Sequence, residues 1–360
     1  MIDITVQSLL RQPMLLCILN LVLVGRNHAM PNMKAAWIAG FGGPEVLEIR
    51  QVPTPQPVRE DLLVRVRASA LNRADLLQRQ GKYPPPPGYP MEIPGIEFAG
   101  EIAEVGSAVR KWKPGQRVFG LVGGAAQAEY IVTHQDLVAE IPDNLDWPSA
   151  AAVPEAFITA HDALWIQAGL RPGETVLINA VGSGVGLAAV QLVRAIHAVP
   201  YGTSRTASKL DLAKSYGMHD GLVVRDNFED LLAAVEQLTH GQGANVMLDL
   251  VGGSYVKTGQ KLLGLKGRMV LVGTVAGGNY ELESRYVMSK RLHIRGTVLR
   301  ARSLEEKIRA TQAFASEVVP LLASGVLRPV IDSSFALEDI ADAHRRLESN
   351  QSTGKVVIEI

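Results

Sequence analysis

Three alternate glycines near the middle of the chain are the residues best suited to bind a ligand. They lie between an apolar run, Thr175 to Asn179, and an apolar stretch of helix-forming residues, Leu187 to Ile196. Glycine lets a backbone turn tightly and approach a ligand closely, and the free N–H groups that begin a helix favour an anion. The pattern predicts a strand–turn–helix unit that binds the pyrophosphate of a dinucleotide, with a ligand-free glycine turn as the alternative. The predicted turn consists of Gly182, Ser183, Gly184, Val185 and Gly186. The Ser183 hydroxyl would add one donor to the phosphate.

The end of the second strand of this unit, Tyr201 to Arg205, indicates which dinucleotide binds. NAD sites generally carry an acidic residue there, which binds the ribose 2′-hydroxyl. In this chain no acid occurs before Asp211. Ser204, Arg205 and Lys209 instead offer hydroxyl and cationic groups suited to a 2′-phosphate. We therefore predict NADPH as the cofactor; a solvated, polar start of a helix is the alternative reading of these residues.

The elements around the glycine turn form a regular alternation of strands and helices. Asn245 to Val251 and Gly267 to Gly273 are apolar strands that end in or near glycine. Such alternation predicts a parallel, doubly wound sheet with its ligand at the carboxyl ends of the strands. We assign residues 154–299 to this Rossmann domain.

The first part of the chain is rich in short strands, glycine and proline. Leu62 to Ala68 alternates apolar and charged residues late in its run, as a half-buried strand does. Residues 33–153 are therefore predicted to form a β-rich domain. It contains the proline run 84–88, which is read either as a spacer or as a loop at a substrate entrance. Part of residues 300–360 is expected to return to this domain, after a helix over 304–323 and through a final strand at 355–360. The predicted fold class is thus α/β, with a β-rich domain and a doubly wound domain.

Residues 1–32 differ from the rest. The run from Pro13 to Gly25 has about a dozen apolar residues, which are too few to span a bilayer. One reading is a signal peptide, and the preferred one is a start codon placed too far upstream, with Met30 or Met33 as the true first residue. We expect this extension to be loosely packed or disordered.

The composition excludes several classes of protein. Lys plus Arg and Asp plus Glu are 36 each, so no global field attracts nucleic acid or an acidic membrane surface. The hydrophobic fraction of 47% is that of a soluble globular protein. The one cysteine, Cys17, forbids an intrachain disulfide and nearly forbids a cysteine-based zinc site. A cytoplasmic protein is expected.

Several motifs together resemble one known family. From Met33 onward the chain is similar to the zinc-free quinone oxidoreductase branch of the medium-chain dehydrogenase/reductase superfamily, whose β-rich domain is GroES-like. The motifs that carry the resemblance are Ser69–Asp75, Gln78–Tyr83, Pro94–Gly100, Lys113–Val118, Val153–Ala156, Ser183–Gly186, Leu248–Tyr255 and Asn350–Lys355.

The resemblance also implies that no metal is bound. The zinc-dependent members place a ligand Cys where Asn72 stands, and a ligand His where Ile96 stands. With both missing, metal-assisted hydride transfer to a ketone is not expected. A quinone or another α,β-unsaturated carbonyl suits such a site, because hydride adds directly and the oxyanion is delocalised.

The resemblance places two hydrogen-bond donors, Asn72 and Tyr83, near the nicotinamide and the substrate. Asp75, three residues after Asn72, would orient it if the segment is helical, and Asn72 could also simply cap that helix. No histidine-centred relay is evident, so the proton that completes the reduction is expected from water. Further cofactor contacts implied by the resemblance are Thr159, Gly273, Thr274, Val275, Leu299, Arg300, Asn350 and Lys355. A tyrosine that contacts the 2′-phosphate in relatives is replaced by Val224, beside Arg225.

These features predict an NADPH-dependent, zinc-independent enzyme that transfers hydride to a small-molecule quinone or enone. An enoyl-thioester reductase is the alternative within enzymes. A non-catalytic NADPH sensor or RNA-binding protein is the alternative outside them, although the chain lacks a basic–aromatic stripe. The strand from Leu292 to Leu299 is expected at a sheet edge and would pair with another copy, as a homodimer or a tetramer.

Overall fold

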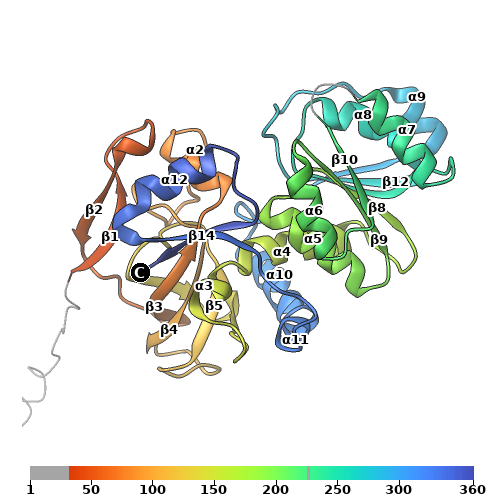
Figure 1. The fold of residues 1–360 in the computed structure, drawn as a ribbon. Coiled ribbons are helices and arrows are strands. Elements are labelled where there is room, and N and C mark those ends of the chain that lie inside the picture. Colours follow the sequence, from red (N-terminus) through yellow and green to blue (C-terminus); the bar gives the residue numbers. More distant parts are fainter. Residues whose placement is uncertain (1–31, 225–227) are drawn as a thin grey trace, which may run out of the picture.

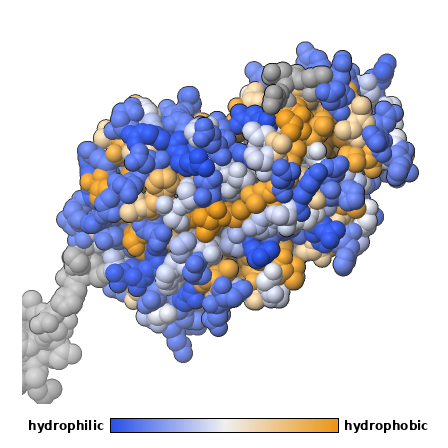
Figure 2. Space-filling view, viewed as in Figure 1, coloured by the Kyte–Doolittle hydropathy of each residue, from blue (hydrophilic) through white to orange (hydrophobic). Residues whose placement is uncertain are grey.

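The computed structural model describes residues 32–224 and 228–360, which form two lobes side by side (Figure 1). The predictions for the N-terminal extension, Cys17, Met30 and Arg225 lie outside the described residues. The face shown in Figure 2 is mainly hydrophilic, with its larger hydrophobic patches near the junction of the lobes and over the lobe that contains the parallel sheet. None of the helices in the described part of the chain is long and apolar enough to cross a membrane.

The first lobe is built on a seven-stranded sheet with the strand order β14-β15-β3-β4-β5-β7, and β6 pairs with β3. Alternate residues of β3, Leu62, Val64 and Val66, pack in one core with Phe98 of β4. A separate hairpin of β1 and β2 flanks the sheet. The strands of this lobe are β1 (Met33–Ile38), β2 (Leu47–Val52), β3 (Asp61–Ala70), β4 (Glu97–Val105), β5 (Arg117–Leu121), β6 (Tyr130–His134), β7 (Val138–Glu140), β14 (Ile331–Ala336) and β15 (Lys355–Glu359).

The second lobe contains a six-stranded sheet, all parallel, with the order β10-β9-β8-β11-β12-β13. The order reverses between β8 and β11, and this switch point is where such sheets bind ligands. The predicted fold class is confirmed. The strands are β8 (Thr175–Ile178), β9 (Val199–Ser204), β10 (Asp220–Val223), β11 (Ala244–Asp249), β12 (Leu263–Leu271) and β13 (His293–Gly296). The helices are α5 (Gly184–Ala195), α6 (Ala207–Ser215), α7 (Glu229–Leu238), α8 (Ser254–Leu262) and α9 (Ser284–Lys290).

The lobes are connected by α4 (Pro154–His161), which packs on α5 and continues as a π-helical turn, η3 (Asp162–Gln167). The helix expected over 304–323 is interrupted at Val318, giving α10 (Leu304–Glu317) and α11 (Val319–Ala323). Pro320 explains the break, because it has no N–H to donate to the preceding turn and its ring clashes with that turn's carbonyl. The remaining helices are η1 (Pro44–Val46), α2 (Arg73–Arg79), η2 (Gln135–Leu137), α3 (Trp147–Ala151), η4 (Leu337–Asp339) and α12 (Ile340–Glu348).

Candidate functional site

The glycine turn follows β8 and leads directly into α5. The helix begins at Gly184, three residues earlier than expected, because Ser183 caps it: the Ser183 hydroxyl accepts from Gly186 N at 3.1 Å and donates to Ala180 O at 2.9 Å. A Cβ at Gly186 would lie 2.6 Å from Val181 O, so only glycine fits there. The glycines thus bring the backbone close around the start of α5, and the N–H groups that begin a helix are the kind of group that binds a pyrophosphate.

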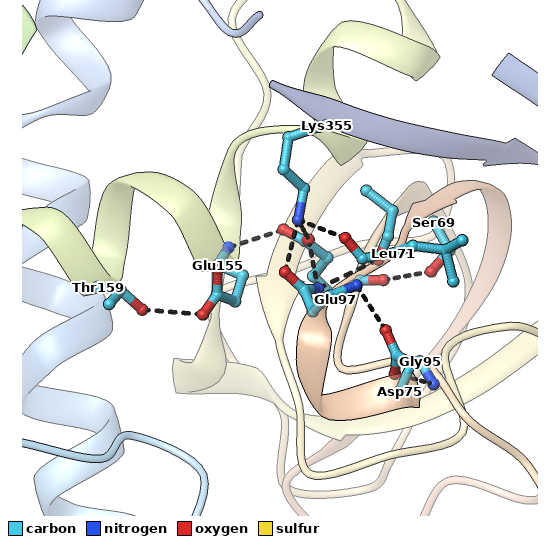
Figure 3. A network of polar contacts seen from close by, with 10 residues as sticks. Ser69, Leu71, Asp75, Gly95, Glu97, Glu155, Thr159 and Lys355 are labelled. Atoms are coloured by element: carbon cyan, nitrogen blue, oxygen red, sulfur yellow. Dashed lines mark hydrogen bonds and ion pairs between the residues drawn. The ribbon is translucent and has the colours of Figure 1, made fainter. Parts of the chain in front are cut away.

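A buried lysine lies against this turn. A Cβ at Gly184 would be 2.5 Å from Cδ of Lys355, so the lysine side chain passes directly over the glycine. The Lys355 ammonium donates to Asn72 Oδ1 and Glu97 Oε1, both at 2.6 Å, and to Leu71 O at 3.0 Å (Figure 3). Glu97 is fully buried and Lys355 is 5% exposed. The predicted cofactor residue Lys355 thus joins the glycine turn to the predicted substrate residue Asn72.

Asn72 precedes α2, and Asp75 of that helix fixes its backbone. Asp75 Oδ2 accepts from Asn72 N at 2.8 Å, and Oδ1 accepts from Gly95 N at 2.9 Å. Burial raises the pKa of Asp75 to about 6. The Asn72 amide donates to Ala70 O at 3.2 Å and to Glu97 Oε1 at 2.8 Å. Both ends of the Asn72 amide are therefore engaged inside the protein.

Glu97 and Glu155 complete this network, and neither was among the residues predicted for the site. Glu97 Oε2 accepts from the backbone N of Glu155 at 2.7 Å, and Thr159 Oγ1 donates to Glu155 Oε1 at 3.2 Å (Figure 3). Burial is the main cause that raises the pKa of Glu155 to about 7. Each of these acids lies inside a short apolar motif, Glu97 in Pro94–Gly100 and Glu155 in Val153–Ala156. An acid in such a motif is expected to be buried, and a buried acid needs a polar partner, so this pattern could have identified both residues.

Tyr83 and Arg300, predicted for the substrate and the cofactor respectively, contact each other. The Arg300 guanidinium lies 4.9 Å from the Tyr83 ring centre and donates to Tyr83 O at 3.2 Å. It also donates to Gly123 O at 2.8 Å and to Gln78 Oε1 at 2.6 Å. The side chain of Arg300 thus ties the loop after β13 to three segments of the first lobe, a role that the sequence did not indicate. Leu299 beside it is buried.

The basic end of β9 gathers cations from both lobes. Lys209 covers Gly182 with its aliphatic part, and its ammonium donates to Asn350 O at 2.9 Å and Ser352 O at 2.6 Å. Arg73 of α2, which sequence reasoning missed, donates to Asn350 Oδ1 at 2.6 Å. Burial, and then repulsion from the Arg205 guanidinium, lower the pKa of both Arg73 and Lys209.

The remaining predicted residues lie at or just after the carboxyl ends of the parallel strands. Ser204 is buried, and its hydroxyl accepts from Thr206 N at 3.3 Å, while Val224 is fully buried in the core behind. Gly273, Thr274 and Val275 follow β12, and Val275 is exposed. At the switch point Asn179 donates to Asp249 Oδ1 at 3.0 Å, a pair that the sequence analysis did not single out.

Comparisons with known proteins agree with this architecture. Residues 58–143 match the alcohol dehydrogenase GroES-like domain, and residues 184–316 match the family described as zinc-binding dehydrogenase. The chain is 34% identical to a quinone oxidoreductase of Lama guanicoe over 331 residues, which are 91% of this chain and 97% of that protein. It is 33% identical to a quinone oxidoreductase of Pseudomonas aeruginosa, covering 90% and 99% of the two chains.

A solved structure of a mycobacterial protein, Rv1454c, complexed with NADPH superposes with a TM-score of 0.82 at 26% identity and covers 91% of this chain and 100% of that one. The parallel sheet, the glycine turn at its switch point and these relatives agree. The chain belongs to the quinone oxidoreductases of the medium-chain dehydrogenase/reductase superfamily and is a nicotinamide-dinucleotide-dependent oxidoreductase.

Proposed function

We propose that the protein is an NADPH-dependent, zinc-independent reductase that transfers hydride to a quinone or another α,β-unsaturated carbonyl. The observation that carries the proposal is the buried Lys355 ammonium, which lies between Asn72 and Glu97 beside the glycine turn. This network fixes the side chains that lie beside the proposed cofactor site.

The residues present do not fit a zinc ion, although one matched family is described as zinc-binding. Zinc sites use Cys thiolate, His nitrogen and carboxylate ligands. Around Asn72 the network offers an amide and the carboxyl groups of Asp75, Glu97 and Glu155, and the Lys355 ammonium already bonds to the Glu97 carboxyl. Within residues 32–224 and 228–360 there is also no group of three or more His, Cys, Asp or Glu side chains that could hold a metal ion. The proposed mechanism therefore contains no metal step.

Without a metal, the chain would act by positioning and by stabilising the oxyanion of the acceptor. The cofactor, when bound, supplies the hydride. The glycine turn would hold its phosphates, and the side chain of Lys355, whose ammonium bonds to Leu71, Asn72 and Glu97, would support that turn from behind. Because the Asn72 amide is fully engaged, we assign to it the positioning of Lys355, and to the Tyr83 hydroxyl and Thr159 the polar contacts at the acceptor. Arg300 would keep Tyr83 in place through its contacts with the ring and the carbonyl.

Preference for NADPH is supported by Arg73, Arg205 and Lys209, which come close together with mutual repulsion at the end of β9. A bound 2′-phosphate would relieve that repulsion. We predict that Arg205→Ala lowers kcat/KM for NADPH by about tenfold or more, which corresponds to one charge-assisted hydrogen bond, and leaves kcat/KM for NADH nearly unchanged.

Steady-state kinetics with both nucleotides checks this prediction, and Arg171→Ala, an exposed arginine at the far end of the same sheet, is the matched control. Equal losses with NADPH and NADH would contradict the assignment of Arg205 to the 2′-phosphate.

The acceptor class is tested with a panel of benzoquinones, naphthoquinones, simple enones and enoyl thioesters. We expect NADPH oxidation with quinones or enones that a chelator does not slow. Turnover with enoyl thioesters alone would favour the enoyl-thioester reductase. NADPH binding without turnover of any acceptor would refute the proposed reaction and favour a sensing or RNA-binding role.

We also propose that the protein is a homo-oligomer located in the cytoplasm. β13 is the last strand of the parallel sheet and pairs only with β12 among the described residues, so its outer edge can pair with a second copy. Met288 and Val298, on either side of this strand, are exposed apolar residues.

A further inference from the structure

The network in Figure 3 holds more acids than cations. Asp75, Glu97 and Glu155 lie around one ammonium, that of Lys355. That ammonium donates directly to Glu97 at 2.6 Å, whereas the side chain of Glu155 receives its hydrogen bond from the neutral Thr159 hydroxyl. Arg300 is a second cation near Asp75. Since a buried carboxylate without its own cation favours its neutral form, Glu155 is the member of this group that keeps a proton.

The contact between Glu155 and Thr159 is unusual for a helix. A threonine within a helix commonly donates to the carbonyl four residues before it. Thr159 instead donates to the side chain of Glu155, the residue four positions before it, with 3.2 Å between Thr159 Oγ1 and Glu155 Oε1. Thr159 is 6% exposed, so its hydroxyl is nearly removed from water. The carboxyl and the hydroxyl are therefore aligned along one side of α4 (Figure 3).

This pair lies next to the glycine turn. A Cβ at Gly184 would be 3.8 Å from Cβ of Ala156, the residue after Glu155, as well as in contact with Lys355. Glu155 as a whole residue is partly exposed, whereas its carboxyl is buried, which raises its pKa. A carboxyl group and a hydroxyl group are thus paired beside the proposed cofactor site.

We propose that the Glu155 carboxylic acid is the proton source of the reduction and that the Thr159 hydroxyl passes the proton to the oxyanion of the reduced acceptor. The inference rests on the proposed function, and it replaces bulk water as the donor. It makes Glu155 a residue that acts through Thr159 rather than one that touches the acceptor.

The step balances without a further reagent. The bound nicotinamide would supply a hydride to the β-carbon of the acceptor. The C=C pair of the acceptor would then shift toward the carbonyl carbon, and the pair of the carbonyl bond would move to its oxygen. For this step the Thr159 hydroxyl, which donates to Glu155 Oε1 in the structure, turns its proton toward the acceptor oxygen and forms the new O–H bond. Thr159 Oγ1 then accepts the proton of the Glu155 carboxylic acid. Glu155 is left as a carboxylate and is protonated again by water before the next turnover.

The charges that face Glu155 agree with this assignment. Burial raises its pKa to about 7, the nearby Glu97 and Asp75 act in the same direction, and Lys355 and the Thr159 hydrogen bond oppose them. The donor is in its acid form below that pH, so the rate of the protonation step should fall as the pH rises through 7.

An infrared titration of the protein without nucleotide tests the protonation state independently of activity. The expected result is a carbonyl stretch of a protonated carboxylic acid that titrates near pH 7, disappears by pH 9 and is missing in Glu155→Gln, where only the contribution of Asp75, which titrates near pH 6, remains. Glu236→Gln, at an exposed position of α7, should keep the band. A spectrum of Glu155→Gln equal to that of the wild type across this range overturns the proposal.

Kinetics then tests the relay. Glu155→Gln and Thr159→Val should each lower kcat by about a hundredfold with an enone at pH 6.5, in the range of general acid catalysis, with KM for NADPH within about twofold. The decline of kcat through pH 7 should vanish in both, and Thr159→Ser should restore it. The loss should be smaller with a benzoquinone, because a hydroquinone anion is a weaker base than an enolate. Variants that keep kcat and the wild-type pH profile overturn the relay, whereas a wild-type protein that turns over no acceptor refutes the proposed function itself.

Discussion

Replacing Lys355 by Met lowers the free energy of unfolding by about 3–5 kcal/mol, because the fully buried Glu97 loses its direct ion pair with the Lys355 ammonium. Methionine keeps most of the side-chain volume over Gly184, so the decrease in the free energy of unfolding would result from the missing charge and not from a cavity. Urea unfolding at pH 7, monitored by circular dichroism, measures the change.

The double variant Lys355→Met/Glu97→Gln should regain a large part of this loss, since no uncompensated charge is then buried. Lys257→Met is the matched control, because the Lys257–Glu281 pair has a similar separation of 2.6 Å but is exposed. It should leave the unfolding curve nearly unchanged. A Lys355→Met variant as stable as this control would contradict the importance of the buried pair.

Protonation of His344 makes a large contribution to the loss of stability in acid. His344 is fully buried, its Nδ1 accepts from the Arg79 guanidinium at 3.3 Å, and Arg79 in turn donates to Glu348. Burial, and then the charge of Arg79, lower the pKa of His344 to about 3. Below pH 6.5 the unfolded chain binds a proton that the native state does not take up until pH 3, so the free energy of unfolding falls over this window. The expected loss from this group is about 2 kcal/mol between pH 7 and pH 5.

Urea unfolding at half-unit steps from pH 7 to pH 4 checks this, with His344→Asn as the variant. Asparagine can still accept from Arg79 but cannot titrate, so the variant should lose less stability than the wild type over this window. His197→Asn is the control, because His197 is exposed and has a positive φ that asparagine tolerates. Parallel curves for the wild type and His344→Asn would contradict the role of this histidine.

The fold class and the dinucleotide turn could be predicted from the sequence because both depend on local patterns. The strand–glycine–helix order around Gly184 and the alternation of apolar strands appear in any reading of the chain. The sequence also showed that no acid follows β9 before Asp211. These signals need no knowledge of which distant segments meet. Two other features were not predicted correctly. The helix expected over 304–323 is broken at Val318. The Ser183 hydroxyl, which was predicted to donate to the phosphate, instead caps α5.

Only the tertiary structure decided the polar network and the cation cluster. Lys355 meets Asn72 because β15 pairs antiparallel with β3, with Val357 opposite Ala70, which joins residues 283 positions apart. Glu155 meets Glu97 because α4 begins against that sheet. The partner of a buried acid or lysine cannot be predicted from the sequence alone, because the register of the whole sheet decides which residues of different strands lie opposite each other. The sequence therefore predicted a dinucleotide site at the glycine turn, and the packing of the two lobes decided which charges lie beside that turn.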